Sequence, residues 1–326
     1  MAKTVTAKAH TNIALVKYWG KKDTHLMLPQ NGSISLTLDH FYTETSVTFD
    51  SQLKHDQVYF NDQLLQPAQS QRISRFLDLI RQRSGVHAPA AVRTMNHVPT
   101  SAGLASSASG FAALATAGSR AAGMDLDATA LSRLARRGSG SATRSVFGGF
   151  VEWHAGHDDQ SSFAEVIQDP VDWDIQMIAV ILKATKKPIS STDGMARVVA
   201  TSPYYPAWVA TAETDLTRMR AAIAAKDLEA VGSIAETNAM RMHALNLSAA
   251  PAFNYFTADT LTAIQAVTDL RAHGINCYYT LDAGPNVKII CAGRDTAVIK
   301  TALQQYFAPE QLIVAKPGPG ITMTEA

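Results

Sequence analysis

A stretch rich in glycine and serine, residues 97–110, carries residue types that bind a phosphate. Pro99 favours an extended approach, Gly103 permits a turn, and serines then lead into a small-residue segment that predicts a helix over 108–122. The first N–H groups of a helix lack partners within it, and the helix dipole favours negative charge at that end. We therefore expect an anion site here, where the hydroxyl of Ser107 adds a donor and a ligand for Mg²⁺. The alternative is that the serines only cap the helix.

Arg144 lies within a second stretch of this kind, residues 138–145, with the sequence Gly-Ser-Gly-Ser-Ala-Thr-Arg-Ser. Glycines let the backbone approach a ligand, and a guanidinium holds a carboxylate or phosphate in a two-pronged pair. A flexible surface loop is the alternative. An apolar strand is expected directly afterwards, over 147–153, so the loop is held at both ends.

Lysines and one aspartate complete the candidate chemistry. An apolar run that starts at Asn12 ends in Lys-Tyr-Trp-Gly-Lys-Lys at 17–22, which by itself also fits an exposed turn with solvated lysines. Asp282 stands between two apolar runs and is followed by Ala-Gly-Pro, where an aspartate often bonds only its own backbone. Residues 186–195 are expected to form a loop with basic and hydroxyl groups.

The elements that must position these groups alternate between strand and helix patterns. Strands are predicted at 4–9, 28–38, 42–49, 58–60, 64–65, 90–96, 147–153, 175–183, 277–281, 286–291 and 312–315. Helices are predicted at 69–83, 108–122, 127–137, 207–225, 227–243, 255–273 and 297–307. The sequence changes character near residue 185, where we expect a domain boundary.

Composition limits the class of protein. The chain has 326 residues, of which 46% are hydrophobic and 17% charged, and this length fits one large or two moderate domains. A net charge of +1 argues against a dedicated binder of nucleic acid or of membrane surfaces. Cys277 and Cys291 lie in apolar runs without metal-ligand spacing, which favours buried thiols. Without a signal peptide at the start or a membrane-length apolar run, a cytoplasmic protein is expected.

The motifs together resemble a known family. Pro-x-x-x-Gly-Leu-x-Ser-Ser-Ala resembles the phosphate loop of the GHMP kinase superfamily, which implies ATP. That loop, the Lys-Tyr-Trp-Gly-Lys motif, the motif around Arg144, Ser-Ser-Thr-x-Gly-Met and Asp-Ala-Gly-Pro-Asn together resemble the diphosphomevalonate decarboxylase family. The resemblance implies an α+β fold with a ribosomal-protein-S5-like N-terminal lobe (1–185), a ferredoxin-like C-terminal lobe (186–326) and a deep active-site cleft between them. It also implies a homodimer.

The resemblance further implies the reaction and the residue roles. ATP would phosphorylate the 3-hydroxyl of (R)-5-diphosphomevalonate with Mg²⁺ present, and loss of phosphate and CO₂ would give isopentenyl diphosphate. Asp282 would deprotonate the hydroxyl, Lys17 would support it electrostatically, and Arg144 would hold the carboxylate. Substrate would be bound by Tyr18, Trp19, Gly20, Lys21, Arg72, Ser139, Gly140, Ser141, Ala142, Thr143, Ser191 and Thr192. ATP would be bound by Gly103, Leu104, Ala105, Ser106, Ser107 and Ala108, with Ser107 also a metal ligand.

Other functions remain open from the sequence. A GHMP small-molecule kinase acting on mevalonate or phosphomevalonate would share the fold and the ATP loop but would not release CO₂. A decarboxylase of a monophosphate substrate is a closer variant, against which Tyr18, Lys21 and Arg72 favour the diphosphate. A catalytically silent nucleotide-binding protein is disfavoured by the joint presence of Lys17, Arg144 and Asp282, and a role with nucleic acid is weakest on charge grounds.

Overall fold

The first of two large sheets is built around two long strands. The computed structural model describes residues 3–98, 106–182 and 189–325. The strand order is β14-β1-β4-β7-β5-β6, with β8 paired to β4 and β9 to β8. The bounds are β1 (Thr4–Val16), β4 (Ser33–Phe49), β5 (Gln57–Phe60), β6 (Gln63–Leu64), β7 (Ala90–His97), β8 (Phe150–Trp153), β9 (Ala164–Gln168) and β14 (Thr322–Glu325).

The burial pattern of β1 shows how this strand joins the two halves of the molecule. Its first residues alternate between buried and half-buried, as expected where one sheet face packs on helices. Val5, Ala7 and Ala9 belong to the core under the helices, whereas Ile13 and Leu15 belong to a core shared with the second sheet. The strand therefore runs from one core into the other and delivers Lys17 at the junction.

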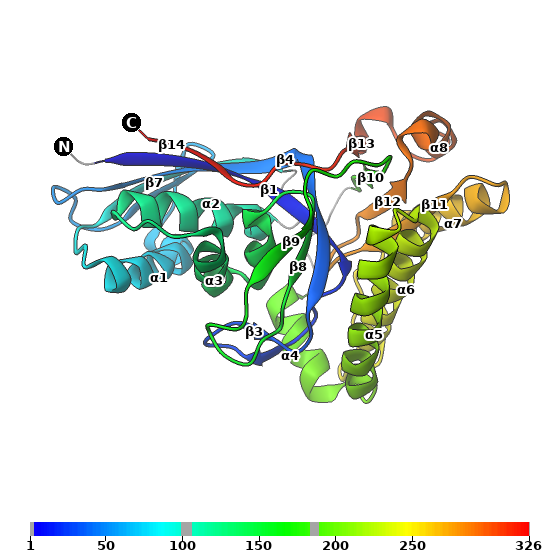
Figure 1. Cartoon of the computed structure of the whole chain (residues 1–326), viewed down its shortest axis with the longest axis horizontal. Helices are drawn as coiled ribbons and strands as arrows, with labels where there is room; N and C mark the ends of the chain where they lie inside the picture. The colour runs from blue at the N-terminus through cyan, green and yellow to red at the C-terminus, as the bar shows by residue number, and fades with distance from the viewer. Residues whose placement is uncertain (1–2, 99–105, 183–188, 326) are drawn as a thin grey trace.

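Helices cover one face of the first sheet (Figure 1). They are α1 (Pro67–Ser84), α2 (Ser106–Ala121) and α3 (Ala128–Gly138), followed by a 3₁₀ helix, η1 (Gly140–Val146). The small residues of α2 permit close packing: a Cβ at Gly118 would lie 2.7 Å from Cδ1 of Ile80 on α1. The Asp127 side chain caps α3 by accepting from the Ala130 N–H. α3 thus begins at a fixed place, and it leads directly into the 3₁₀ segment that carries Arg144.

The second sheet has the order β11-β12-β10-β13, and its pairs are all antiparallel. Its strands are β10 (Gln176–Val180), β11 (Cys277–Leu281), β12 (Val287–Cys291) and β13 (Leu312–Ala315). The helices of this half are α4 (Ser191–Thr201), α5 (Tyr205–Ala224), α6 (Leu228–Leu247), α7 (Ala258–Ala272) and α8 (Thr296–Leu303), with 3₁₀ turns η2 (Gly293–Asp295) and η3 (Pro309–Gln311). Along the chain, this half consists of a strand, helices, two strands, a helix and a strand. Together with the strand order of the sheet, this arrangement is a ferredoxin-like unit, which confirms that prediction.

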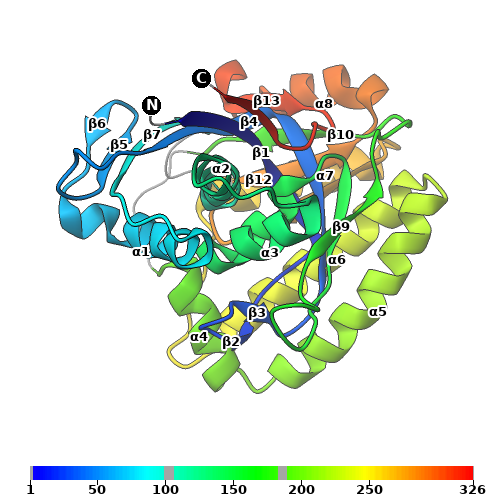
Figure 2. The ribbon, with the colours of Figure 1, turned by 60° about the vertical axis from the view of Figure 1, so that its left-hand side comes forward.

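The boundary expected at residue 185 stays a prediction, and the membership of the two sheets bears on it. β10 precedes that residue but pairs with β12 and β13 of the second sheet, and β14 returns from the C-terminal end to pair with β1. The change of sheet therefore falls between β9 and β10. The two ends of the chain lie close together at one end of the first sheet (Figures 1 and 2), because Val5 pairs with Glu325.

Part of the loop expected over 186–195 is helical instead. Ser190 accepts a hydrogen bond from the Asp193 N–H and caps α4, which begins at Ser191. Gly194 lies inside this helix, where a Cβ would sit 2.9 Å from the Tyr255 hydroxyl oxygen, so glycine lets Tyr255 approach the helix. The sequence analysis also missed the hairpin of β2 (Lys21–Asp23) and β3 (Leu28–Pro29), as well as β9 and β14, all of which are short.

Two other expectations concern burial and membranes. Cys277 and Cys291 are buried free thiols, as predicted. Burial raises the pKa of the Cys277 thiol to about 11. Of the helices in the described ranges, none combines the length and the apolar character needed to cross a bilayer.

Candidate active site

A carboxylate held between two lysines lies where the two sheets meet. Nζ of Lys17, just past the end of β1, donates to Oδ1 of Asp282 at 2.9 Å. Nζ of Lys288, on β12, lies 3.0 Å from Oδ2 of the same carboxyl. The side chains of the two lysines are 2% and 0% exposed, and that of Asp282 is 21% exposed. Asp282 is thus the part of this cluster that solvent or a substrate reaches.

Burial and charge set the protonation of the cluster. Burial alone would raise the pKa of Asp282, but the neighbouring ammonium groups of Lys17 and Lys288 together hold it well below its usual value. Burial lowers the pKa of Lys17 to about 8, although the nearby Asp282 opposes this shift. At neutral pH the Asp282 carboxylate is therefore ionised. Lys17 is still mostly protonated, because its pKa lies slightly above neutral pH.

Helix α6 fixes the backbone of Lys17. Oδ1 of the buried Asn238 accepts the Lys17 N–H at 2.8 Å, and Nδ2 of Asn238 donates to Asp215 at 2.9 Å. A carboxylate can only accept, so Asp215 determines which way the amide of Asn238 points. Nδ2 of Asn31 donates to the Lys17 carbonyl at 2.9 Å. Both backbone groups of Lys17 are thus held by side chains from outside its strand.

Arg144 is held rigidly on η1. Its Nε donates to Asn12 Oδ1 at 3.1 Å and to Ser35 Oγ at 3.0 Å, and its Nη1 donates to Ser33 Oγ. Among the described residues, none accepts a hydrogen bond from Nη2, so that end of the fork is available to a ligand. Burial lowers the pKa of Arg144 to about 10, and the charge of Asp282 is near enough to oppose this shift. The guanidinium therefore stays charged at neutral pH.

Hydroxyl groups connect the 3₁₀ segment to the start of α2. Oγ of Ser139 lies 3.5 Å from Oγ of Ser107 and 3.4 Å from Oγ of Ser141. Nδ2 of Asn12 donates to the Ser141 carbonyl at 3.0 Å, and Asn12 also contacts Arg144. Ser107 is exposed in the first turn of α2, and that turn contains no acidic residue. The row of hydroxyls therefore runs from the helix N-terminus toward Arg144.

Two further cations lie beside this row, and among the described residues neither forms an ion pair with an acidic side chain. Lys21 is half-buried on β2, and its pKa is lowered by burial and then by the positive charge of Arg72. Arg72, on α1, donates from Nη2 to the Gly138 carbonyl at 2.7 Å and lies over the Phe111 ring. Two like charges this close favour a bound anion. Helix α4 packs next to β2 (Figure 2), and in its first turn Ser191 is half-buried and Thr192 exposed.

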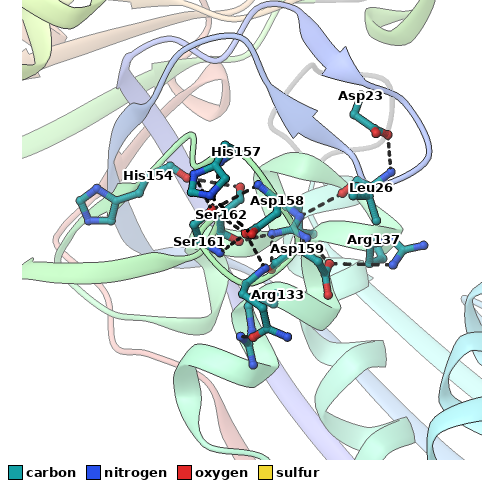
Figure 3. Close-up of polar contacts among 12 residues, drawn as sticks. Asp23, Leu26, Arg133, Arg137, His154, His157, Asp158, Asp159, Ser161 and Ser162 are labelled. Atoms are coloured by element: carbon teal, nitrogen blue, oxygen red, sulfur yellow. Dashed lines mark hydrogen bonds and ion pairs between the residues drawn. The ribbon is translucent and has the colours of Figure 1, made fainter.

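A polar cluster away from the lysines anchors the hairpin and α3. The buried Arg136 donates to the Asp159 carboxylate and the Ser162 carbonyl, and its Nε donates to the Leu26 carbonyl at 3.0 Å. Figure 3 shows Asp159 with Arg137 beside it, 3.9 Å away, and Leu26 on the neighbouring turn. The cluster thus ties the turn after Lys21 to the helix that leads into Ser139.

Some expected substrate residues are placed by the structure in the core. Trp19 is 3% exposed, and its Nε1 donates to Asn246 at 3.1 Å, so its ring supports α6 and is not presented to a ligand. Ala142 and Thr143 are fully buried, and the Thr143 hydroxyl bonds the Gly140 carbonyl at 2.6 Å. The expected role of these three residues in substrate binding stays a prediction, and their buried side chains leave only backbone groups for it. Their role is to shape the backbone.

The other expected residues fall into three groups. The ring of Tyr18 packs edge-on against Trp153, 4.8 Å between centroids, and among the described residues its hydroxyl has no partner. Gly140 allows this packing, since a Cβ there would lie 2.8 Å from the Tyr18 ring. Ser106 is exposed and Ala108 buried at the start of α2. Gly103, Leu104 and Ala105 lie outside the described residues.

The donors at α2 fit a nucleotide with its metal. The helix N-terminus offers free N–H groups beside Ser106 and Ser107, and a Cβ at Gly110, one turn further on, would meet nothing within 4 Å. No group of three His, Cys, Asp or Glu side chains suited to a metal is found within the described part of the chain. Magnesium bound through phosphates and one or two protein oxygens needs no such cage, so this donor set fits it.

The sequence analysis missed Lys288, Asn238 and His243. A signal for Lys288 was present: it is a single lysine inside the apolar run Val-Lys-Ile-Ile-Cys, where a buried charge needs a partner. His243 on α6 is 1% exposed, and neither ring nitrogen has a partner among the described residues. Burial lowers its pKa to about 3, with a further contribution from Lys17, so the imidazole is neutral. Nothing in the sequence around Asn238 or His243 set them apart.

Comparison with known proteins places this site in a family. The family model of the diphosphomevalonate decarboxylase-like N-terminal domain matches residues 9–164. That of the mevalonate 5-diphosphate decarboxylase C-terminal domain matches residues 177–318. The diphosphomevalonate decarboxylase of Bos taurus is 34% identical over 330 residues, which cover 94% of this chain and 81% of the bovine one.

Solved structures agree over the whole length. The mevalonate diphosphate decarboxylase from Enterococcus faecalis is 46% identical, with a TM-score of 0.95 and coverage of 100% of both chains. A structure of MDDEF in complex with MVAPP, AMPPCP and magnesium is 47% identical, with a TM-score of 0.96 and the same coverage. Sequence and fold agree through both sheets and through every segment that carries the cluster. The chain belongs to the diphosphomevalonate decarboxylase family.

Proposed function

We propose that this protein catalyses the ATP-dependent decarboxylation of (R)-5-diphosphomevalonate to isopentenyl diphosphate, ADP, phosphate and CO₂, by way of phosphorylation of the 3-hydroxyl. The observation that carries the proposal is the ionised Asp282 carboxylate between Lys17 and Lys288, with Arg144 near it. Family membership and a relative solved with MVAPP, AMPPCP and magnesium support it.

Asp282 acts on the hydroxyl proton in this scheme. A tertiary alcohol is a poor acid, and a carboxylate of depressed pKa cannot ionise it in advance. Asp282 therefore accepts the proton within the transition state, as the oxygen bonds to the γ-phosphorus and the bond from that phosphorus to ADP breaks. Such a role contributes roughly 10²–10⁴-fold. Lys17 stabilises the negative charge that develops on the oxygen.

Arg144 orients the substrate carboxylate for the second step. When the C3–O bond breaks, phosphate leaves with the bonding electrons. The bond between the carboxylate carbon and C2 then breaks, and its electron pair forms the C2–C3 double bond as CO₂ departs. Strong pairing of Arg144 with the carboxylate stabilises the ground state and so opposes this loss. We infer that Arg144 positions the group, and that exclusion of water from the site does more for the second step.

The diphosphate and the nucleotide are bound by two different sets of groups. Lys21, Arg72 and the first turn of α4 bind the substrate diphosphate, and Ser106 and Ser107 with the α2 N-terminus bind the ATP phosphates. Ser107 and phosphate oxygens hold the magnesium ion, which, when bound, offsets phosphate charge.

An assay that follows ADP and trapped CO₂ together tests the reaction. Wild-type protein with mevalonate 5-diphosphate and ATP is expected to release both in equal amounts. Asp282→Asn is expected to bind both substrates but lose roughly 10²–10⁴-fold in kcat. ADP without CO₂ would instead identify an alcohol kinase, and an unchanged kcat in Asp282→Asn would remove this residue as the base.

Assembly and location extend the proposal. A homodimer is expected, and sedimentation at micromolar concentration tests it, since a monomer there would contradict the expectation. A cytoplasmic location is likewise expected, and cell fractionation with compartment markers tests it.

A further inference from the structure

Lys288 is a charged residue on an otherwise apolar face of the second sheet. Its neighbour on the same face of β12, Ile290, packs in the core shared with α6. Lys288 stands opposite Thr280 of β11 in the ladder, and both residues are fully buried. Removal of an ammonium group from water costs several kcal/mol unless a partner offsets it. The partner that the structure supplies is Oδ2 of Asp282, at 3.0 Å, with a weaker contact of 3.3 Å to the Asn286 carbonyl.

Each of the two lysines contacts one oxygen of the Asp282 carboxylate. Lys17 reaches Oδ1 from the first sheet, and Lys288 reaches Oδ2 from the second. A single lysine would neutralise the carboxylate, so the second leaves the cluster with a net charge of +1, from two ammonium groups and one carboxylate. This excess is not what a purely structural ion pair requires, because burial of an additional charge is unfavourable. It suits a site where negative charge appears during the reaction.

We propose that Lys288 is a positioning residue for the reaction: by holding Oδ2 while Lys17 holds Oδ1, it prevents the Asp282 carboxylate from rotating and keeps it ionised until it meets the substrate hydroxyl. This inference rests on the proposed function and assigns a role to a residue that the family motifs did not indicate. A carboxylate that is hydrogen-bonded at Oδ1 and ion-paired at Oδ2 has one preferred orientation. The proton acceptor is therefore in place before the substrate arrives.

The groups that face the cluster determine how it titrates. They are Lys17 from β1, Lys288 from β12, Arg144 from η1 and the neutral His243 from α6. The positive charge of Lys288 is one cause of the lowered pKa of Lys17. Removal of Lys288 therefore raises the pKa of Lys17, because a like charge is lost. A lysine that served only to fill space would have no such effect.

Lys288→Met, which keeps a long apolar stem on β12, tests the inference together with Lys288→Gln and Lys288→Arg. We expect kcat for CO₂ release to fall at least tenfold in the Met variant, with KM for both substrates changed less than about threefold. The alkaline fall of kcat, set by Lys17 in wild type, should move up by about half to one pH unit. Lys288→Arg should recover part of kcat and keep the wild-type pH limb.

The controls separate the possible outcomes. Lys226→Met removes an exposed ion pair to Asp172 and should leave kcat and the pH limb unchanged. If Lys288→Met does not fold by circular dichroism, the Gln variant gives the same two readouts. The inference would be overturned if the Met or Gln variant kept both the wild-type kcat and the wild-type alkaline fall of kcat. It would also be overturned if kcat fell but its alkaline fall stayed at the same pH. Wild-type protein that releases no CO₂ would instead overturn the proposed function.

Discussion

Replacement of Arg144 by lysine keeps the charge but removes the fork. In the protein, Nε and Nη1 of Arg144 are occupied by Asn12, Ser35 and Ser33, which leaves Nη2 for the substrate. A lysine has a single nitrogen and cannot hold these acceptors and a carboxylate together. One lost hydrogen bond to a charged group is worth about 1.5–3 kcal/mol. At about 1.4 kcal/mol per decade, kcat/KM for mevalonate 5-diphosphate should fall roughly 10–150-fold.

The same substitution carries a cost in stability. Asn12, Ser33 and Ser35 are at most 2% exposed, so an acceptor that lysine fails to reach is left without its charged donor. Each such buried group costs about 1–3 kcal/mol. We expect the midpoint of thermal unfolding to fall by several degrees while the protein remains folded at the assay temperature.

Steady-state kinetics with both substrates varied, after thermal unfolding has been measured, decides this prediction. Because Arg144 orients the carboxylate and does not stabilise its departure, KM for the mevalonate compound should rise by at least as much as kcat falls. Arg220→Lys is the matched control, since Arg220 is 44% exposed and its partners within the described ranges are Glu152 and Thr217. A value of kcat/KM within threefold of wild type in Arg144→Lys would refute the assignment.

Three other outcomes follow from the site. Ser107→Ala should raise KM for ATP several-fold with little change for the mevalonate compound, and steady-state kinetics with an effect confined to the latter would mean that α2 does not bind the nucleotide. For Lys17, whose pKa is lowered to about 8, kcat should fall as pH rises through about 8, since its charge beside Asp282 is lost; a flat profile to pH 9.5 would contradict this. The pKa of Lys17 is lower in the folded protein than in the unfolded chain. Between these two pKa values the unfolded chain binds more protons, so Lys17 makes the free energy of unfolding rise with pH. Gly20→Ala should destabilise the protein by at least about 1–3 kcal/mol, because φ is +132° and a Cβ would lie 1.7 Å from the Tyr205 hydroxyl; an unaltered denaturation midpoint would refute this.

Local signals in the sequence predicted much of the fold and the reactive groups. The alternation of β1, the small residues of α2 and the apolar runs of β11 and β12 follow from periodicity, which depends only on near neighbours. The Asp-Ala-Gly-Pro turn placed Asp282 correctly at the end of β11, and it lies at the junction of the sheets. A short element such as β2 was missed because three residues carry no period.

Residue type alone did not distinguish ligand contact from core packing. Trp19 lies within the motif that identifies the family, yet its ring packs in the core against α6, whereas its neighbour Lys21 stays near solvent. The direction of these side chains depends on where α6 and α4 pack. Those helices come more than 150 residues later in the chain, starting at Ser191 and Leu228.

The sequence by itself determined which chemistry is possible: serines and free N–H groups for phosphate, cations for a polyanion, and one carboxylate for a proton. Only the tertiary structure decided that Lys17 donates a hydrogen bond to Oδ1 of Asp282, 265 positions away, and that Lys288 forms an ion pair with Oδ2. The physical reason is that contacts between distant residues depend on how two sheets and α6 pack, and no local pattern encodes that packing. The protonation of the cluster follows from the same packing, because burial and neighbouring charge exist only in the folded chain.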